Sequence, residues 1–249
     1  MKTLLDLQNV CLTYQTLTDE IEAVKDLSFT CNEREFVSII GPSGCGKTTV
    51  LSLIAGLIQP TSGKILIDGK QIKDSSNLGY MLQKDQLFSW RTIEKNVFLP
   101  LEIKGMNNEE NRKYTLDLLK KYDLFNFRKN YPDQLSGGMR QRVALIRTLA
   151  SKPKLLLLDE PFSALDYQTR LSVCDDVSKI IKAEGKTAVL VTHDISEAIS
   201  MSDIIIVLTS RPAKVKAIYK PNLEGDSPLK KRESKYFGEL FEKLWKELN

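Results

Sequence analysis

The residues with the clearest chemical meaning form one short stretch of glycines, a lysine and two threonines. It reads Gly41-Pro42-Ser43-Gly44-Cys45-Gly46-Lys47-Thr48-Thr49 and fits the pattern Gly-x4-Gly-Lys-Ser/Thr. The glycines let the backbone curl so that successive N–H groups face a polyphosphate, and the following helix adds its positive end. Lys47 is placed to reach the β- and γ-phosphates, and the Thr48 hydroxyl to bind Mg²⁺. This phosphate loop (residues 41–49) predicts nucleotide binding; the simpler alternative is a glycine turn that caps an ordinary helix.

Polar residues also follow two apolar runs that predict buried strands. Four leucines lead into Asp159 and Glu160, and a second run leads into His193, the only histidine of the chain. Open α/β sheets bind ligands at the ends of such strands. Asp159 is predicted to hold Mg²⁺, and Glu160 to act as general base toward an attacking water. His193 is a candidate contact to the γ-phosphate, although a lone histidine is more often structural.

Three further elements complete the predicted site. Gln83 ends another short predicted strand and is a candidate contact to the metal or the water. Ser136 can cap the helix after it, and Gly137 and Gly138 expose the first N–H groups of that helix, which makes a second anion site. Tyr14 stands just ahead of a polar turn and either stacks on an adenine ring or packs as an ordinary core or surface residue. Two anion sites in one chain predict a symmetric head-to-tail dimer with two ATP molecules at its interface.

Apolar patterning indicates the elements that must position these residues. Strands are expected over most of residues 3–40 and again after residue 153, whereas helical periodicity fills about 86–152. We therefore expect an α/β P-loop NTPase of the RecA-like kind, with a mixed sheet core, an antiparallel β subdomain and an inserted helical lobe. The ATPase domain is expected to span 1–220. Residues 221–249 predict an amphipathic helical tail that either packs on the parent domain or binds a partner.

Composition limits the classes of function. The chain has 249 residues, 42% of them hydrophobic and 27% charged, which is typical of a globular domain with a substantial core. No apolar run approaches the ~18 residues needed to cross a bilayer, and we expect no export signal. A net charge of +4 is too mild to indicate nucleic acid, and the spacing of the four cysteines favours a reduced compartment over zinc or disulfides. Cys45 either has its pKa lowered by the helix end or is simply a small residue that fits.

Taken together, these motifs resemble the ATP-binding subunit of an ABC transporter from the first strand to about residue 219. In the family's order come the phosphate loop, Gln83, the signature Leu135-Ser136-Gly137-Gly138-Met139, the strand ending in Asp159-Glu160, the turn Ser163-Ala164-Leu165-Asp166 and the switch His193. The resemblance implies that Ser136, Gly137 and Gly138 of one subunit contact the ATP held by the other. It also implies that Asp166 orders the dimer interface.

Residues 85–97 and the segment Ser210-Arg211-Pro212 are similar to those of nitrate, sulfonate and taurine import ATPases. The resemblance implies an ATPase on the cytoplasmic face of the membrane, bound to two transmembrane permease subunits and served by an extracytoplasmic solute-binding protein. Phe88 and Trp90 are candidate permease contacts, with core packing as the alternative. Two other functions stay open: a non-transport ABC ATPase acting on DNA or ribosomes, and an importer ATPase for another substrate such as a thiamine-precursor pyrimidine.

Overall fold

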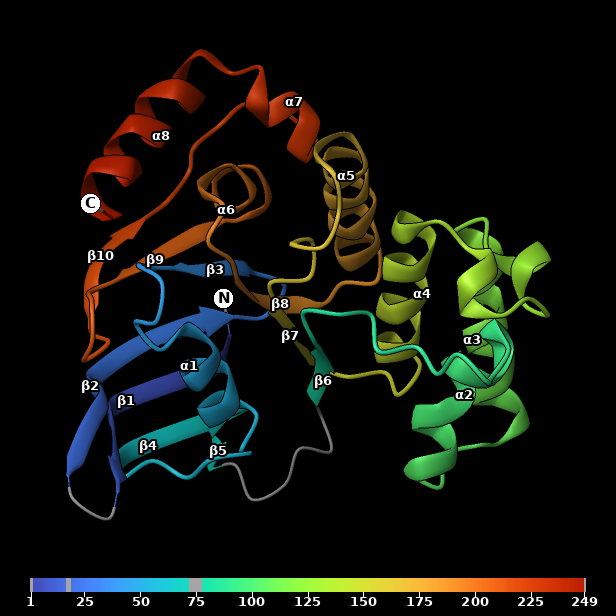
Figure 1. The fold of residues 1–249 in the computed structure, drawn as a ribbon, viewed down its shortest axis with the longest axis horizontal. Helices are drawn as coiled ribbons and strands as arrows, with labels where there is room; N and C mark the ends of the chain where they lie inside the picture. Colours follow the sequence, from blue (N-terminus) through green and yellow to red (C-terminus); the bar gives the residue numbers. More distant parts are fainter. Residues whose placement is uncertain (1, 17–18, 72–77, 249) are drawn as a thin grey trace.

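Figure 1 shows a computed structural model of the chain, which describes residues 2–16, 19–71 and 78–248. The strands are β1 (Thr3–Gln15), β2 (Glu20–Asn32), β3 (Phe36–Ile40), β4 (Ser62–Ile67), β5 (Lys70–Gln71), β6 (Leu78–Met81), β7 (Leu155–Asp159), β8 (Thr187–Val191), β9 (Ile204–Leu208) and β10 (Val215–Tyr219). The α-helices are α1 (Lys47–Ile54), α2 (Ile93–Ile103), α3 (Glu109–Lys121), α4 (Gly137–Leu149), α5 (Tyr167–Ala183), α6 (Ile195–Met201), α7 (Pro228–Arg232) and α8 (Lys235–Leu248). The polar turn predicted after Tyr14 includes residues 17 and 18, which lie outside the described residues.

The larger sheet has the strand order β10-β9-β3-β8-β7-β6, and its neighbouring strands are parallel except for β9 with β10. Strands β3, β7 and β8 are buried along their whole length, as expected for apolar runs covered on both faces. In the register, Ile39 and Asp159 both lie beside Val191, so these three strands end at the same level. The residues that follow them are therefore delivered to one edge of the sheet.

A smaller antiparallel sheet has the order β2-β1-β4-β5. Its apolar face carries Leu5, Leu27 and Ile65, which belong to one buried cluster with Val50 of α1 and Leu157 of β7. Helix α1 is thus held between the two sheets. The predicted mixed α/β fold with a separate antiparallel sheet is confirmed.

Between β6 and β7 the regular elements are helices joined by loops, and Figure 1 shows α2, α3 and α4 grouped beside the β6 edge. Helices α2 and α3 begin at polar caps: the Thr92 side chain accepts a hydrogen bond from the Lys95 amide, and that of Asn108 from the Asn111 amide. These α-helices run from residue 93 to 149, within the predicted range of about 86–152. Their buried apolar residues join those of α5 in one cluster, which attaches the helices to the sheet.

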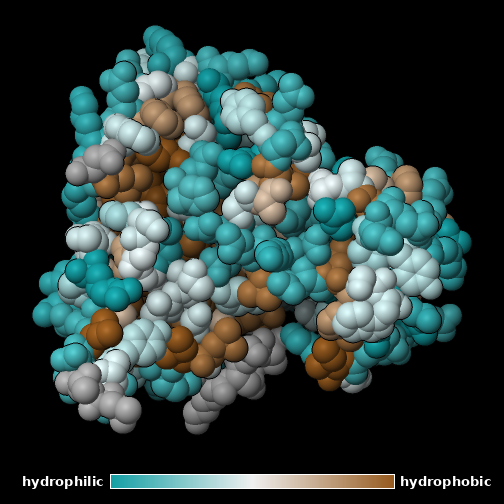
Figure 2. Space-filling view, in the orientation of Figure 1, coloured by the Kyte–Doolittle hydropathy of each residue, from teal (hydrophilic) through white to brown (hydrophobic). Residues whose placement is uncertain are grey.

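The tail after β10 forms two helices, α7 and α8. The Ser227 side chain caps α7, and Asp175 of α5 accepts a hydrogen bond from the Leu229 amide at 3.4 Å. Leu244 of α8 is fully buried against β9 and α6, and Figure 2 shows apolar side chains gathered where α8 faces the sheet. The next residue, Trp245, is 56% exposed because one residue along a helix turns the side chain by about 100°.

Candidate active site

The phosphate loop curls around its own lysine. Gly44 and Gly46 have φ values of 72° and 114°, a left-handed conformation that costs glycine little, and Gly46 is the residue before the first turn of α1. The Lys47 ammonium donates to the carbonyl oxygens of Gly41 and Pro42, at 2.8 and 2.9 Å. The strand, loop and helix predicted from the sequence are thus present. The lysine charge lies inside the curl, close to the N-terminus of α1.

Cys45 fills the base of this loop. Its side chain is 1% exposed, and a Cβ atom added at Gly41 would lie 2.8 Å from the Cys45 Sγ atom. Burial raises the pKa of the Cys45 thiol, because desolvation outweighs the effect of the nearby Lys47. Of the two alternatives for Cys45, the structure therefore supports the small residue that fits. Ser43 and Thr48 are exposed, and Thr49 is half-buried. The loop therefore has a packed base and an open outer side.

Asp159 at the end of β7 meets the start of α1. Its carboxylate accepts hydrogen bonds from the Thr48 hydroxyl at 3.2 Å and from the Tyr80 hydroxyl at 3.3 Å. Burial raises the pKa values of both the Asp159 carboxyl and the Tyr80 hydroxyl. Tyr80 is absent from the predicted site, although a hydroxyl within an apolar strand signals that a polar partner is needed.

Glu160 and His193 face each other across the ends of β7 and β8. The Glu160 amide donates to the Val191 carbonyl at 2.9 Å, which continues the strand pairing by one residue. The φ of Glu160 is 44°, unusual for a residue with a side chain. Its Oε2 atom lies 3.1 Å from the His193 Nδ1 atom. The histidine side chain is 60% exposed and that of Glu160 22%, so the pair lies at the mouth of the site.

Gln83 is connected to Glu160 by hydrogen bonds through a serine side chain. Strand β6 ends at Met81, two residues before the predicted strand end at Gln83, and the chain bends at Gln83. The exposed Gln83 side chain donates through Nε2 to the Ser163 hydroxyl at 3.3 Å, and that hydroxyl donates to the Glu160 carbonyl at 3.0 Å. The structure thus connects Gln83, Glu160 and His193, the three predicted catalytic residues. Ser163 begins the turn that ends at Asp166 and is absent from the predicted site.

The second anion site lies on a different part of the molecule. The Ser136 hydroxyl caps α4 by accepting from the Met139 amide at 3.3 Å. Asp166 caps α5 by accepting from the Thr169 amide at 3.0 Å, and hydrogen bonding to Thr169 lowers the Asp166 pKa. Figure 1 shows α1 and α4 on opposite sides of β6 and β7. One chain therefore does not bring its phosphate loop and its Ser136 together.

Close packing surrounds the glycines of this second site. A Cβ atom added at Gly138 would lie 2.8 Å from the Val173 Cγ2 atom of α5, and one added at Gly137 would lie 3.0 Å from the Leu165 Cδ2 atom. Both glycines therefore allow α4 to approach α5 and the turn before it.

Tyr14 lies on β1 opposite Ile21 and is 38% exposed. Two residues along β2 from Ile21, the Ala23 carbonyl oxygen would lie 3.4 Å from a Cβ atom added at Gly46. This end of the β1–β2 hairpin therefore lies beside the phosphate loop.

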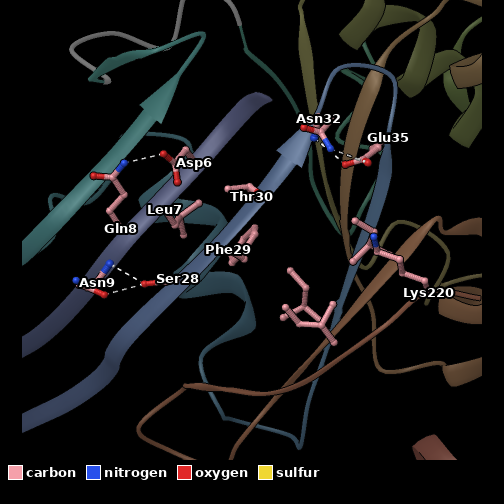
Figure 3. Close-up of a pocket in the computed structure, with 13 residues that line it drawn as sticks. Asp6, Leu7, Gln8, Asn9, Ser28, Phe29, Thr30, Asn32, Glu35 and Lys220 are labelled. Atoms are coloured by element: carbon pink, nitrogen blue, oxygen red, sulfur yellow. Dashed lines mark hydrogen bonds between the residues drawn. The ribbon is translucent and has the colours of Figure 1, made fainter. Parts of the chain in front are cut away.

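A wide groove of about 680 Å³ lies elsewhere, between β1 and β2 on one side and β9 and β10 on the other (Figure 3). Its polar side chains bond mainly to one another, as in the contacts of Asn9 with Ser28 and of Asn32 with Glu35. None of the predicted site residues lines this groove.

Comparison with known proteins identifies the family to which the chain belongs. Residues 24–163 match the family described as ABC transporter. The chain belongs to the ABC transporter family. It is 48% identical over 248 residues to the ABC transporter ATP-binding protein YtlC of Bacillus subtilis, covering 98% of this chain and 95% of YtlC. The predicted resemblance is confirmed, and this family member is an ATP-binding protein that hydrolyses ATP.

Two further matches bear on import and assembly. The aliphatic sulfonates import ATP-binding protein SsuB of Bacillus cereus is 39% identical, with 83% of this chain and 81% of SsuB covered. A dimeric structure of MJ0796, a bacterial ABC transporter cassette, matches with a TM-score of 0.74 and 37% identity, covering 88% of this chain and 99% of that one. Within residues 2–16, 19–71 and 78–248, no helix is long and apolar enough to cross a membrane.

Proposed function

We propose that this chain is the ATP-hydrolysing subunit of an importer for a small anionic or polar solute of the nitrate, sulfonate or taurine type. The sulfonate import relative supports import, as do residues 85–97 and 210–212. The observation that supports ATP hydrolysis is the Glu160–His193 pair beside Asp159, where the neighbouring strands β7 and β8 end. The solute enters through partner proteins, so the chain itself would not select it.

The phosphate loop fits the triphosphate of ATP. Its backbone N–H groups would bind phosphate oxygens, and Lys47 would exchange the carbonyls of Gly41 and Pro42 for phosphate oxygens. The exposed ring of Tyr14, at the hairpin end beside the loop, would stack on the adenine.

The residues around Asp159 fit a magnesium ion. Its carboxylate lies 3.2 Å from the Thr48 hydroxyl, and such hard oxygen atoms are the ligands that Mg²⁺ prefers. Thr48 and Asp159 would hold the ion, with Gln83 as a further ligand. When bound, it would neutralise phosphate charge. Tyr80 would keep the Asp159 carboxylate in position.

Glu160 is proposed as the general base, which takes a proton from the attacking water. His193 would orient the Glu160 carboxylate through their 3.1 Å contact and reach the γ-phosphate with its exposed ring. Gln83 would sense the same region, since Ser163 connects it to the Glu160 backbone.

The separation of α1 and α4 supports a head-to-tail dimer, in which Ser136, Gly137 and Gly138 of one copy contact ATP held by the other and Asp166 lies at the interface. The dimeric MJ0796 cassette supports the same arrangement. The dimer would bind two permease subunits at the cytoplasmic membrane face, with solute supplied by an extracytoplasmic binding protein. Trp90 is 72% exposed and stacks on Phe88 at 4.8 Å between ring centroids, which favours a partner contact over core packing.

The variant Glu160→Gln tests the catalytic assignment. ATP binding should be retained while turnover falls by ~10²–10⁴-fold, the usual range for loss of a general base. With ATP, this variant should form dimers in light scattering, whereas Lys47→Ala should not. Near-normal hydrolysis by Glu160→Gln would refute the base assignment, and monomers in both variants would refute the dimer.

Co-purification of the intact chain from membranes tests the importer assignment. Two permease subunits should accompany it, and solute-loaded binding protein should stimulate its ATPase activity. Recovery of DNA or ribosomes in place of permeases would overturn import.

A further inference from the structure

Arg170 connects the segment that carries Asp166 to the segment that carries His193. It lies in the first turns of α5, and its guanidinium turns back toward the start of that helix. Its Nη2 atom donates to the Leu165 carbonyl at 2.9 Å, and its Nη1 atom lies 3.5 Å from the Asp194 Oδ2 atom. One side chain therefore spans from the residue before Asp166 to the residue after His193.

Asp194 is itself held in a defined position. Its Oδ1 atom accepts from the amides of Ser196 and Glu197, at 2.7 and 3.1 Å, and so caps α6. Its own amide donates to the Thr192 hydroxyl at 3.0 Å, and that hydroxyl donates to the buried Glu197 carboxylate at 2.6 Å. Both neighbours of His193 are thus fixed by side chains. The backbone that carries the imidazole is therefore held on both sides of His193.

An arginine suits this position because its planar guanidinium can hold a carbonyl and a carboxylate at the same time. The Arg170 side chain is 24% exposed, and its Nε atom is buried without a hydrogen-bond partner. A buried donor left unpaired is unfavourable, so the two Nη contacts must offset that cost for the side chain to stay in this position.

We propose that Arg170 is a positioning residue, which sets the place of His193 opposite Glu160 by tying Asp194 to the Leu165 carbonyl. The proposal rests on the proposed function only for its catalytic consequence. A displacement of the Leu165 carbonyl would pass through Arg170 to Asp194, and from there to the imidazole. The hydrolytic residues of one nucleotide site would therefore respond to the segment that, in the proposed dimer, contacts the second copy.

The single histidine makes this proposal directly measurable, because the imidazole signal of the protein in NMR belongs to His193 alone. The test variant is Arg170→Met in the full-length, nucleotide-free chain. Its matched control is Arg142→Met: Arg142 of α4 is 27% exposed, also has a buried unpaired Nε atom, and also pairs with an aspartate of α5, Asp176, at 3.4 Å. The imidazole signal should shift or broaden in Arg170→Met and keep its wild-type position in Arg142→Met.

Steady-state kinetics supply the second measurement. For Arg170→Met we expect kcat to fall by ~10- to 100-fold with the KM for ATP within about twofold of wild type, because misplacing a catalytic group by about 1 Å costs up to ~10²-fold. Arg170→Lys keeps the charge but replaces the two separate Nη donors by a single ammonium on a differently shaped side chain, so it should move the imidazole signal in the same direction. It also serves if Arg170→Met does not fold.

The outcomes separate this proposal from the proposed function. A wild-type imidazole signal in either Arg170 variant, or an equal change in Arg142→Met, would overturn the positioning role. A moved signal with unchanged kcat would support the positioning role while contradicting the proposed part of His193 in hydrolysis. Failure of the Glu160→Gln prediction would contradict the general base and leave the imidazole result standing.

Discussion

Replacing the buried Glu197 by glutamine should make the protein less sensitive to alkaline pH. Glu197 lies in the first turn of α6, the short helix after His193; it is 2% exposed and accepts a hydrogen bond from the Thr192 hydroxyl at 2.6 Å. Burial raises the pKa of its carboxyl to about 7 from an ordinary 4.5, despite that hydrogen bond. Glutamine keeps the shape and the oxygen acceptor but never ionises.

The expected magnitude follows from linkage. The pKa is raised on folding, so the stabilising contribution is fully present below the unfolded value of 4.5 and is lost as pH rises through about 7. A shift of about 2.5 pKa units at 1.36 kcal/mol per unit gives a full change of about 3 kcal/mol. Between pH 5.5 and pH 8 the wild-type protein should lose about 2 kcal/mol of this, and Glu197→Gln none of it.

Urea unfolding of the nucleotide-free protein at these two pH values measures the effect. The free energy of unfolding of Glu197→Gln relative to wild type should rise by about 2 kcal/mol between the lower and the higher pH. Glu239→Gln, on the exposed side of α8, is the control and should show the same difference from wild type at both pH values. A Glu197→Gln difference that does not change with pH would refute the argument.

Two further substitutions test individual contacts. Tyr80→Phe removes the hydroxyl that donates to Asp159. The Mg²⁺ concentration needed for half-maximal ATPase activity should rise by roughly 2- to 10-fold, the equivalent of one hydrogen bond. An unchanged magnesium dependence would exclude a role for that contact. Gly138→Ala places a methyl group 2.8 Å from the Val173 Cγ2 atom and should lower the free energy of unfolding by about 1–3 kcal/mol. Adding Val173→Ala should restore part of that loss. No recovery in the double variant would show that the two side chains do not clash.

Local patterns carried the prediction of the loop, the strand ends and the helix starts. The Gly-x4-Gly-Lys pattern requires no knowledge of distant contacts, and the apolar runs before Asp159 and His193 identify buried strands from their own composition. Their meeting at one edge follows from a general property of parallel sheets. For these reasons the fold class and the placement of Glu160 and His193 at neighbouring strand ends could be anticipated, whereas their direct contact could not.

The contacts that fix the site were not predictable in the same way. Tyr80 bonds to Asp159 because β6 lies beside β7, although 79 residues separate the two positions in the chain. Ser163 joins Gln83 to Glu160 only because the turn after β7 lies within hydrogen-bond distance of the segment after β6. Strand order and the path of the loops determine such contacts, and neither can be predicted from the spacing of residues within a motif.

The precision of the site therefore depends on residues outside the familiar motifs. Register alone brings β3, β7 and β8 to one level, with Ile39 and Asp159 beside Val191, but it leaves the residues after each strand free to point in several directions. The Thr192 amide donates to the Ile39 carbonyl at 3.3 Å, which continues the β3–β8 pairing up to the residue before His193. After Thr192 the backbone pairing ends, and the chain is held by side chains: the Thr192 hydroxyl accepts from the Asp194 amide, and Arg170 pairs with the Asp194 carboxylate. A motif residue can thus be present and still be misplaced when one of these supporting side chains is lost.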